Sequence, residues 1–162
     1  MDNRLRLVFD TNIYGLIIDE NEELLLKAQT TSKVIIYGFD VIRKELRNTP
    51  TNLKQENKNY RGLLLAGYDN IVKNHSYVLT PIMETLAREY LEEYDGGISK
   101  DKMWNDFLIV ACSSIHTLDI IVSEDNHSMR SSPAVRAYKK VNEKNQLREP
   151  VFYSIKELDK LL

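Results

Sequence analysis

Short apolar runs alternate with longer amphipathic segments along the chain. Runs rich in Val, Ile and Leu that are bounded by polar or turn residues predict buried strands. Such runs cover residues 5–9, 34–37, 77–79, 120–122 and 151–153. They are apolar throughout instead of alternating with polar residues, which is typical of strands whose two faces are both covered. The pattern therefore predicts a parallel sheet.

The segments between these runs have helical spacing or helix start signals. Helices are predicted over residues 22–27, 40–47, 80–94, 99–116, 133–145 and 154–162, and a polar loop over 48–59.

Three details of these helices bear on the fold. Asp40 is a candidate cap for the second helix. In the fourth helix, Trp104, Leu108, Ala111 and Ile115 recur at helical spacing, so we expect them to face the core. The alternation of strands and helices predicts one three-layer α/β/α domain over residues 1–162, with a central parallel sheet.

Composition narrows the function classes. Hydrophobic residues make up 43% of the 162 and charged residues 28%, as in ordinary globular domains. The net charge is −2, so the strongly basic balance of many nucleic-acid binders is missing, and only local patches could bind phosphates. With one cysteine, no membrane-length apolar run and no signal segment, we expect a cytoplasmic protein without membrane association.

Four carboxylates occupy related positions in this pattern. Asp10 and Asp125 follow predicted strands, whereas Glu45 and Asp106 lie on predicted helices. The carboxyl ends of parallel strands converge on one crevice, so the four side chains are expected to meet there. Clustered carboxylate oxygens suit Mg²⁺ or Mn²⁺, which would assist hydrolysis of a phosphodiester.

Each acid also has an ordinary structural explanation. Asp10 is a candidate helix cap, and Asp125 fits turn chemistry. Asp106 could be a first-turn acid favoured by the helix dipole. Glu45 could form a surface ion pair with a neighbour such as Arg43. Only the joint placement of the four acids favours a metal site.

Two motifs resemble those of the PIN-domain ribonuclease family, in particular its VapC-like members. The first is the opening Asp10-Thr11-Asn12 after an apolar strand. The second begins at Asn105-Asp106-Phe107-Leu108 and reaches Ser123-Glu124-Asp125, so that its two aspartates are 19 residues apart. Glu45 matches the family's acid on the helix after the second strand. The resemblance extends over residues 5–153.

The resemblance implies a PIN-like fold and a metal-dependent endoribonuclease acting on RNA. The implied catalytic and Mg²⁺- or Mn²⁺-binding residues are Asp10, Glu45, Asp106 and Asp125. Polar support and substrate contacts are expected from Thr11, Asn12 and Ser123, with phosphate contacts from Arg43 and Arg47 beside Glu45.

Partners follow from the same resemblance. It implies either a toxin paired with an antitoxin protein or an RNA-processing nuclease. Homodimers are common in the family, and the apolar segments 63–65 and 90–94 suggest surface beyond the needs of one small core. We therefore expect a homodimer.

Other interpretations stay open. A non-catalytic RNA-binding or protein-interaction domain could have the same fold. An aspartyl phosphatase of the haloacid-dehalogenase type is disfavoured, because it needs a second Asp where this chain has Asn12. On the 133–145 helix, Arg136, Lys140 and Lys144 form one stripe, which either binds RNA phosphates or is a solvated face.

Overall fold

The main sheet of the protein has five parallel strands. A computed structural model describes residues 2–50, 54–55 and 58–162. The spatial order of the strands is β5-β2-β1-β6-β7, and every neighbouring pair is parallel. Their bounds are β1 (Leu5–Phe9), β2 (Val34–Phe39), β5 (Ser76–Tyr77), β6 (Ile120–Val122) and β7 (Phe152–Tyr153).

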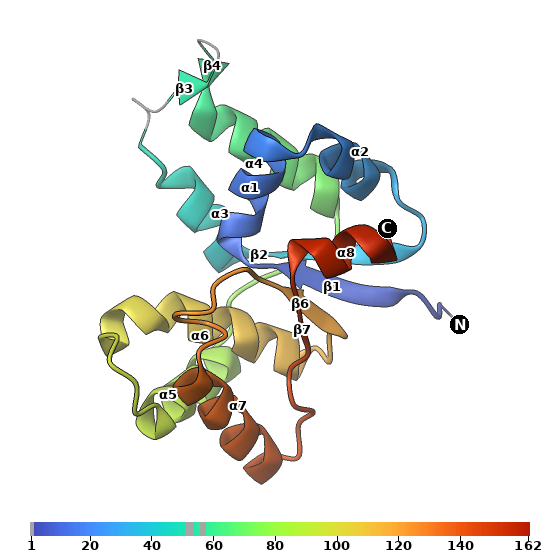
Figure 1. Ribbon diagram of the computed structural model, residues 1–162. Coiled ribbons are helices and arrows are strands. Elements are labelled where there is room, and N and C mark those ends of the chain that lie inside the picture. The colour runs from blue at the N-terminus through green and yellow to red at the C-terminus, as the bar shows by residue number, and fades with distance from the viewer. Residues whose placement is uncertain (1, 51–53, 56–57) are drawn as a thin grey trace.

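Helices cover both faces of this sheet. In Figure 1, α1 to α4 and α8 lie on one side, whereas α5 to α7 lie on the other. This arrangement confirms the predicted three-layer α/β/α, PIN-like fold. The helix bounds are α1 (Thr11–Glu20), α2 (Glu22–Thr30), α3 (Asp40–Arg47), α4 (Tyr60–Val72), α5 (Pro81–Glu93), α6 (Lys100–Ile115), α7 (Ser132–Lys144) and α8 (Ile155–Leu161).

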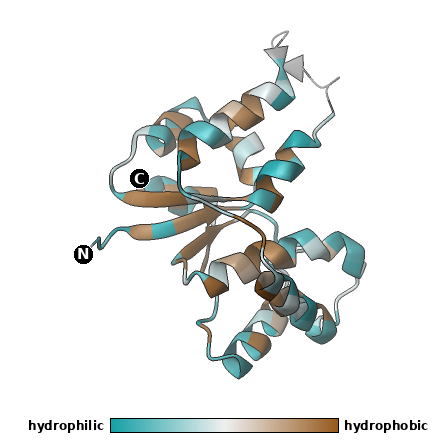
Figure 2. Cartoon of the chain, turned by 180° about the vertical axis from the view of Figure 1, so that it is seen from behind, coloured by the Kyte–Doolittle hydropathy of each residue, from teal (hydrophilic) through white to brown (hydrophobic). Residues whose placement is uncertain are grey.

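The core lies between the sheet and the two helical layers. Leu7, Val8 and Phe9 of β1 are fully buried, because helices cover both faces of this central strand. Figure 2 shows apolar strands in the middle and polar helix surfaces turned outward. Because helices cover both faces of the sheet, the side chains on both faces of each strand are apolar, and the strands appear in the sequence as continuous apolar runs.

The order of the strands indicates at which point of the sheet a ligand would bind. The chain runs from β1 outward through β2 to β5, then crosses back to β6 on the other side of β1. The order therefore reverses between β1 and β6. In open α/β sheets, ligands bind in the crevice outside the carboxyl ends of the strands at such a point.

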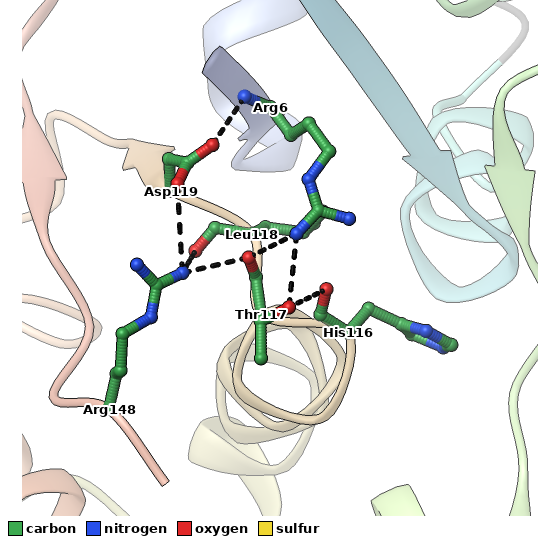
Figure 3. Close-up of polar contacts among 6 residues, drawn as sticks. All are labelled: Arg6, His116, Thr117, Leu118, Asp119 and Arg148. Carbon is green, nitrogen blue, oxygen red and sulfur yellow. Dashed lines mark hydrogen bonds and ion pairs between the residues drawn. The ribbon is translucent and has the colours of Figure 1, made fainter. Parts of the chain in front are cut away.

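Two arginines hydrogen-bond to the segment that follows the C-terminal end of α6 (Figure 3). Arg6 Nη2 donates to the carbonyl of Thr117 at 2.5 Å and to its hydroxyl at 3.0 Å. Arg148 Nη2 donates to the carbonyls of Thr117 at 2.8 Å and Leu118 at 3.4 Å. Asp119 accepts the backbone N–H of Arg6 at 2.7 Å. These bonds satisfy carbonyls just past the helix end and link α6 to β1.

Helix α1 was not predicted from the sequence. Asp10 begins it as the N-cap, and its carboxylate accepts the backbone N–H of Thr11 at 2.8 Å. Ile13 and Ile17 are fully buried one turn apart, which holds the helix against the core.

The expected cap at Asp40 is wrong. Phe39 is the N-cap of α3 and Asp40 is its first residue. The Asp40 carboxylate instead accepts the backbone N–H of Leu79 at 3.1 Å, which links α3 to the segment before α5.

The expected core face of α6 is only partly correct. Leu108 and Ala111 are buried, whereas Trp104 and Ile115 are half-buried at its margins. Met103 and Phe107 are fully buried instead. The helix is covered from several directions, so a single helical stripe does not describe its burial.

The apolar segments that suggested a dimer lie in the core. Leu64, Tyr90 and Tyr94 are buried, and Leu63 and Leu65 are half-buried. These segments provide little free surface for a second copy, so the homodimer stays a prediction that rests on the family resemblance alone.

The polar segment predicted as a loop lies partly outside the described residues. Its described part includes a short antiparallel pair, β3 (Lys54–Gln55) and β4 (Lys58–Asn59). Within the ranges that the structure describes, no helix is long and apolar enough to cross a membrane.

Candidate active site

The four predicted acids gather at the carboxyl edge of the sheet. Asp10 directly follows β1, and Asp125 follows the adjacent strand β6. Asp106 projects from α6 and Glu45 from α3. Hydrogen bonds from hydroxyl side chains join neighbouring members of the cluster, so residues far apart in sequence meet at the switch point.

Asp10 is both a helix cap and a member of this cluster. Its carboxylate is 4% exposed. Oδ1 accepts the N–H of Thr11, whereas Oδ2 accepts the hydroxyl of Ser123 at 2.8 Å. Ser123 is fully buried, and its Oγ also accepts the backbone N–H of Asp125 at 3.1 Å. The two explanations for Asp10 are therefore compatible, because each uses a different oxygen.

Ser128 joins the two remaining aspartates, and the sequence did not single it out. Its Oγ lies 2.8 Å from Asp106 Oδ2 and is also hydrogen-bonded to Asp125 Oδ2. A hydroxyl has one hydrogen to donate, so both bonds can form together only when one of the carboxyl groups carries a proton. Asp125 Oδ1 closes a turn by accepting the N–H of Ser128 at 2.9 Å.

The position of Asp106 excludes its ordinary explanation. Helix α6 begins at Lys100, and the acid in its first turn is Asp101. Asp106 lies almost two turns into the helix, where the dipole gives a carboxylate little stabilisation.

Glu45 points into the cluster instead of pairing at the surface. Its Oε1 accepts the hydroxyl of Thr11 at 2.7 Å. No ion pair among the described residues includes Glu45, and its neighbour Arg43 binds Asp69 through two bonds of 3.0 and 3.1 Å. Glu45 therefore forms no ion pair with Arg43, whose guanidinium is bound to Asp69.

The pKa values of the acids reflect crowding without a counter-charge. Burial raises the pKa of Asp10 to about 6, against hydrogen bonds from Ser123 and Thr11 that lower it. Burial, followed by the charge of Asp10, raises the pKa of Asp106 to about 7. Burial also raises the pKa of Glu45. A cation in the cluster would favour the ionised form of all three carboxyls.

The donor set fits a hard divalent cation by its chemistry, although not as a ready-made cage. In the described part of the chain, no three His, Cys, Asp or Glu side chains are arranged to hold one metal ion together. Mg²⁺ does not require such a cage, because it usually keeps several waters and is bound through one or two carboxylates plus substrate phosphate. Pairs of these acids are therefore sufficient.

The remaining predicted contacts lie at the margin. Asn12 is exposed in the first turn of α1, and Arg47 is exposed at the end of α3. Arg43 is held by Asp69, so its guanidinium is already occupied. Contacts of these three residues with RNA stay predictions.

The basic stripe on α7 pairs with acids from α5 and the segment after it. Each of its three cations has one acidic partner within 3.6 Å, which favours the solvated-face interpretation over phosphate binding. The pairs are Arg136–Asp95 at 3.3 Å, Lys140–Glu93 at 2.9 Å and Lys144–Glu89 at 3.6 Å.

No protein-family model matches this sequence, and no curated protein sequence matches it either. The structure, in contrast, is similar to a chain of VapBC2 from Rickettsia felis, in the crystal structure of VapBC2 bound to a DNA fragment from their promoter. The TM-score is 0.53, over 93% of this chain and 98% of that chain. The two chains share a fold. At 14% sequence identity, the likeness to VapBC2 extends to the fold alone.

Proposed function

We propose that this protein is a metal-dependent endoribonuclease that hydrolyses RNA phosphodiester bonds. One observation carries the proposal: Asp10, which is buried, and Asp106, which is half-buried, both have raised pKa values and lie with two further acids at the switch point of a parallel sheet. Such crowding destabilises the fold unless a cation neutralises it, so purely structural sites avoid it.

The four acids would hold Mg²⁺ or Mn²⁺. When bound, such an ion lowers the pKa of a water and stabilises negative charge on the phosphate. The hydroxyls of Ser123 and Ser128 keep Asp10, Asp106 and Asp125 in fixed orientations. Cation binding would release the protons that the acids hold near neutral pH.

The biological role proposed is that of a toxin in a toxin–antitoxin pair, with an antitoxin protein as partner. The fold shared with a VapBC2 chain favours this role over general RNA processing, which the sequence motifs alone do not separate from it. The fold likeness does not identify the RNA that is cut.

The second candidate is a non-catalytic RNA-binding or protein-interaction domain. It is favoured by the lack, in the described residues, of three acidic or histidine side chains arranged around one ion. It predicts neither metal binding nor cleavage, so one assay separates the two functions.

The test is cleavage of a mixed RNA pool in Mg²⁺ or Mn²⁺, with EDTA as the blank. We expect Asp106→Asn to lower the rate by about 100-fold or more, because a metal site contributes several kcal/mol to transition-state stabilisation. Asp101→Asn is the matched control, since Asp101 is exposed on the same helix and should leave the rate unchanged.

Two outcomes would contradict the proposal. If the Asp106→Asn protein cuts as fast as the wild type, the acids are not the active site. If the wild type cuts no RNA in either metal, the non-catalytic domain becomes the better explanation.

A further inference from the structure

A groove opens beside the acidic site, between α3 and α6. It shares Glu45 with that site and is also lined by Asn105. Burial raises the pKa of Glu45, against hydrogen bonds from Thr11 and Asn105 that lower it. The groove has a volume of about 510 Å³, within the range of roughly 300–1,000 Å³ that is usual for small-molecule sites. It is therefore continuous with the proposed chemistry and large enough for one nucleotide.

The walls of the groove combine an aromatic ring with apolar and amide groups. Trp104 is half-buried and lines it together with Leu79, which is 36% exposed. Asn48 and Asn105 contribute amides that can donate to and accept from a base edge. An aromatic side chain beside amides is the combination that proteins use to hold an unstacked base.

The groove is lined by two carboxylates, Asp40 and Glu45, and by one cation, Lys44. Lys44 is the cationic side chain in its wall and is exposed. The Asp40 carboxylate is engaged by the backbone N–H of Leu79. That hydrogen bond orients Asp40 but leaves its charge, so a phosphate beside the base would lie on the Lys44 side of the groove, away from the two carboxylates.

We propose that this groove binds the base of a nucleotide next to the cleaved phosphate, with Trp104 as the stacking side chain. The inference rests on the proposed nuclease function, and it makes the substrate single-stranded, because a base in a duplex cannot enter the groove. Trp104 is then a specificity-determining residue, not a catalytic one.

Trp104 is the only tryptophan of the chain, so its fluorescence reports the groove directly. The experiment uses the Asp106→Asn protein in Mg²⁺, which should bind RNA without cutting it. We expect a single-stranded hexanucleotide to quench the fluorescence in a saturable way. A duplex of the same sequence and a hexanucleotide without bases should leave the fluorescence unchanged.

Variants at Trp104 test the energetic side of the inference. Trp104→Leu should weaken binding of labelled single-stranded RNA by about 10-fold or more, as expected for loss of one base stack. Trp104→Tyr keeps an aromatic ring and should restore most of the affinity. Thermal unfolding of both variants shows whether the fold survives. In the cleaving protein, Trp104→Leu should raise KM about tenfold and change kcat less.

The outcomes separate this inference from the proposed function. If the wild type cuts RNA, yet RNA neither quenches Trp104 nor binds more weakly to the Leu variant, the groove assignment is wrong and the nuclease stands. If a duplex quenches as strongly as a single strand, single-strand selection is wrong. If no RNA binds or is cut, both proposals fail, and a protein partner becomes the better candidate for the groove.

Discussion

The hydroxyls of Thr11, Ser123 and Ser128 hold the acids of the candidate site at fixed positions. In the absence of a cation, these hydrogen bonds keep the carboxyl groups close together, although the groups repel one another once they are ionised. Asp10 and Asp106 respond with pKa values of about 6 and about 7, above the ordinary value of 3.8. The cluster should therefore lower the stability of the metal-free protein as it ionises.

The pH dependence of stability follows from these values. Between pH 4 and 7 the folded chain binds more protons at these aspartates than the unfolded chain does, so their contribution to the free energy of unfolding falls as pH rises. For Asp106 alone, we expect a loss of about 2 kcal/mol between pH 5 and 8, since one pKa unit corresponds to about 1.4 kcal/mol. The measurement is urea unfolding in EDTA at several pH values.

Asp106→Asn isolates this contribution. His116, whose pKa is lowered by burial, acts in the opposite direction, so the comparison between proteins matters more than the raw slope. The variant should gain stability over the wild type as pH rises from 5 to 8, whereas Asp101→Asn should follow the wild type. Parallel profiles for wild type and Asp106→Asn would show that the pKa of Asp106 is not raised in the folded protein.

The sequence predicted the four acids of the site but not all of their supports. Asp10 and Asp125 were recognisable because they follow apolar strands. The position of Ser128, three residues after Asp125, is typical of a turn. The spacing does not show that this turn faces Asp106, so the sequence did not predict the contact. Arg43 was assigned to substrate from its nearness to Glu45, although neighbours along a helix point in different directions.

A buried polar network joins α5 and α7 to the last turn of α6. The hydroxyl of Tyr90 donates to Asn142 Oδ1 at 2.5 Å. The Asn142 side-chain amide donates to Ser114 Oγ at 2.9 Å and to the carbonyl of Arg148 at 2.7 Å. Each partner is satisfied, so the network fixes α7 against the helix that carries Asp106.

Replacing Asn142 should therefore destabilise the fold. Asn142→Ala leaves the buried Tyr90 hydroxyl with only its longer bond of 3.3 Å to Ser114 and removes the donor to the Arg148 carbonyl, so we expect a loss of about 1–3 kcal/mol. Glu143→Ala, on the exposed side of the same helix, should change stability by less than about 0.5 kcal/mol. Chemical unfolding measures both, and equal effects of the two substitutions would mean that the network contributes nothing.

The elements themselves were predictable where the pattern was simple. Apolar runs located four of the five main strands, whereas the run 77–79 overlaps β5 only at Tyr77. Thr80-Pro81 located the start of α5. Helix α1 was missed because its residues follow a strand without a break and include the isoleucines Ile13 and Ile17, which also suit a strand. The sequence predicted that Trp104 faces the core, whereas it is half-buried. The burial of a helix residue depends on which other helix packs against that face, and the local pattern does not show this.

The alternation of strands and helices along the whole chain predicted the three layers of the fold but not the order of the strands in the sheet. That order depends on which strand each crossover returns to, which local pattern does not specify. The order β5-β2-β1-β6-β7 places the ends of β1 and β6 side by side. The whole fold is therefore what converts separate acids into one site.

The proposed function requires these acids to bind one or more divalent cations at the switch point. A crystal structure grown with Mn²⁺ tests it most directly, because anomalous scattering locates manganese without reference to activity. We predict a manganese peak in contact with Asp10 or Asp106 and within water-mediated reach of Asp125 and Glu45. No peak at the cluster at millimolar Mn²⁺, or peaks only at other surface carboxylates, would contradict the claim.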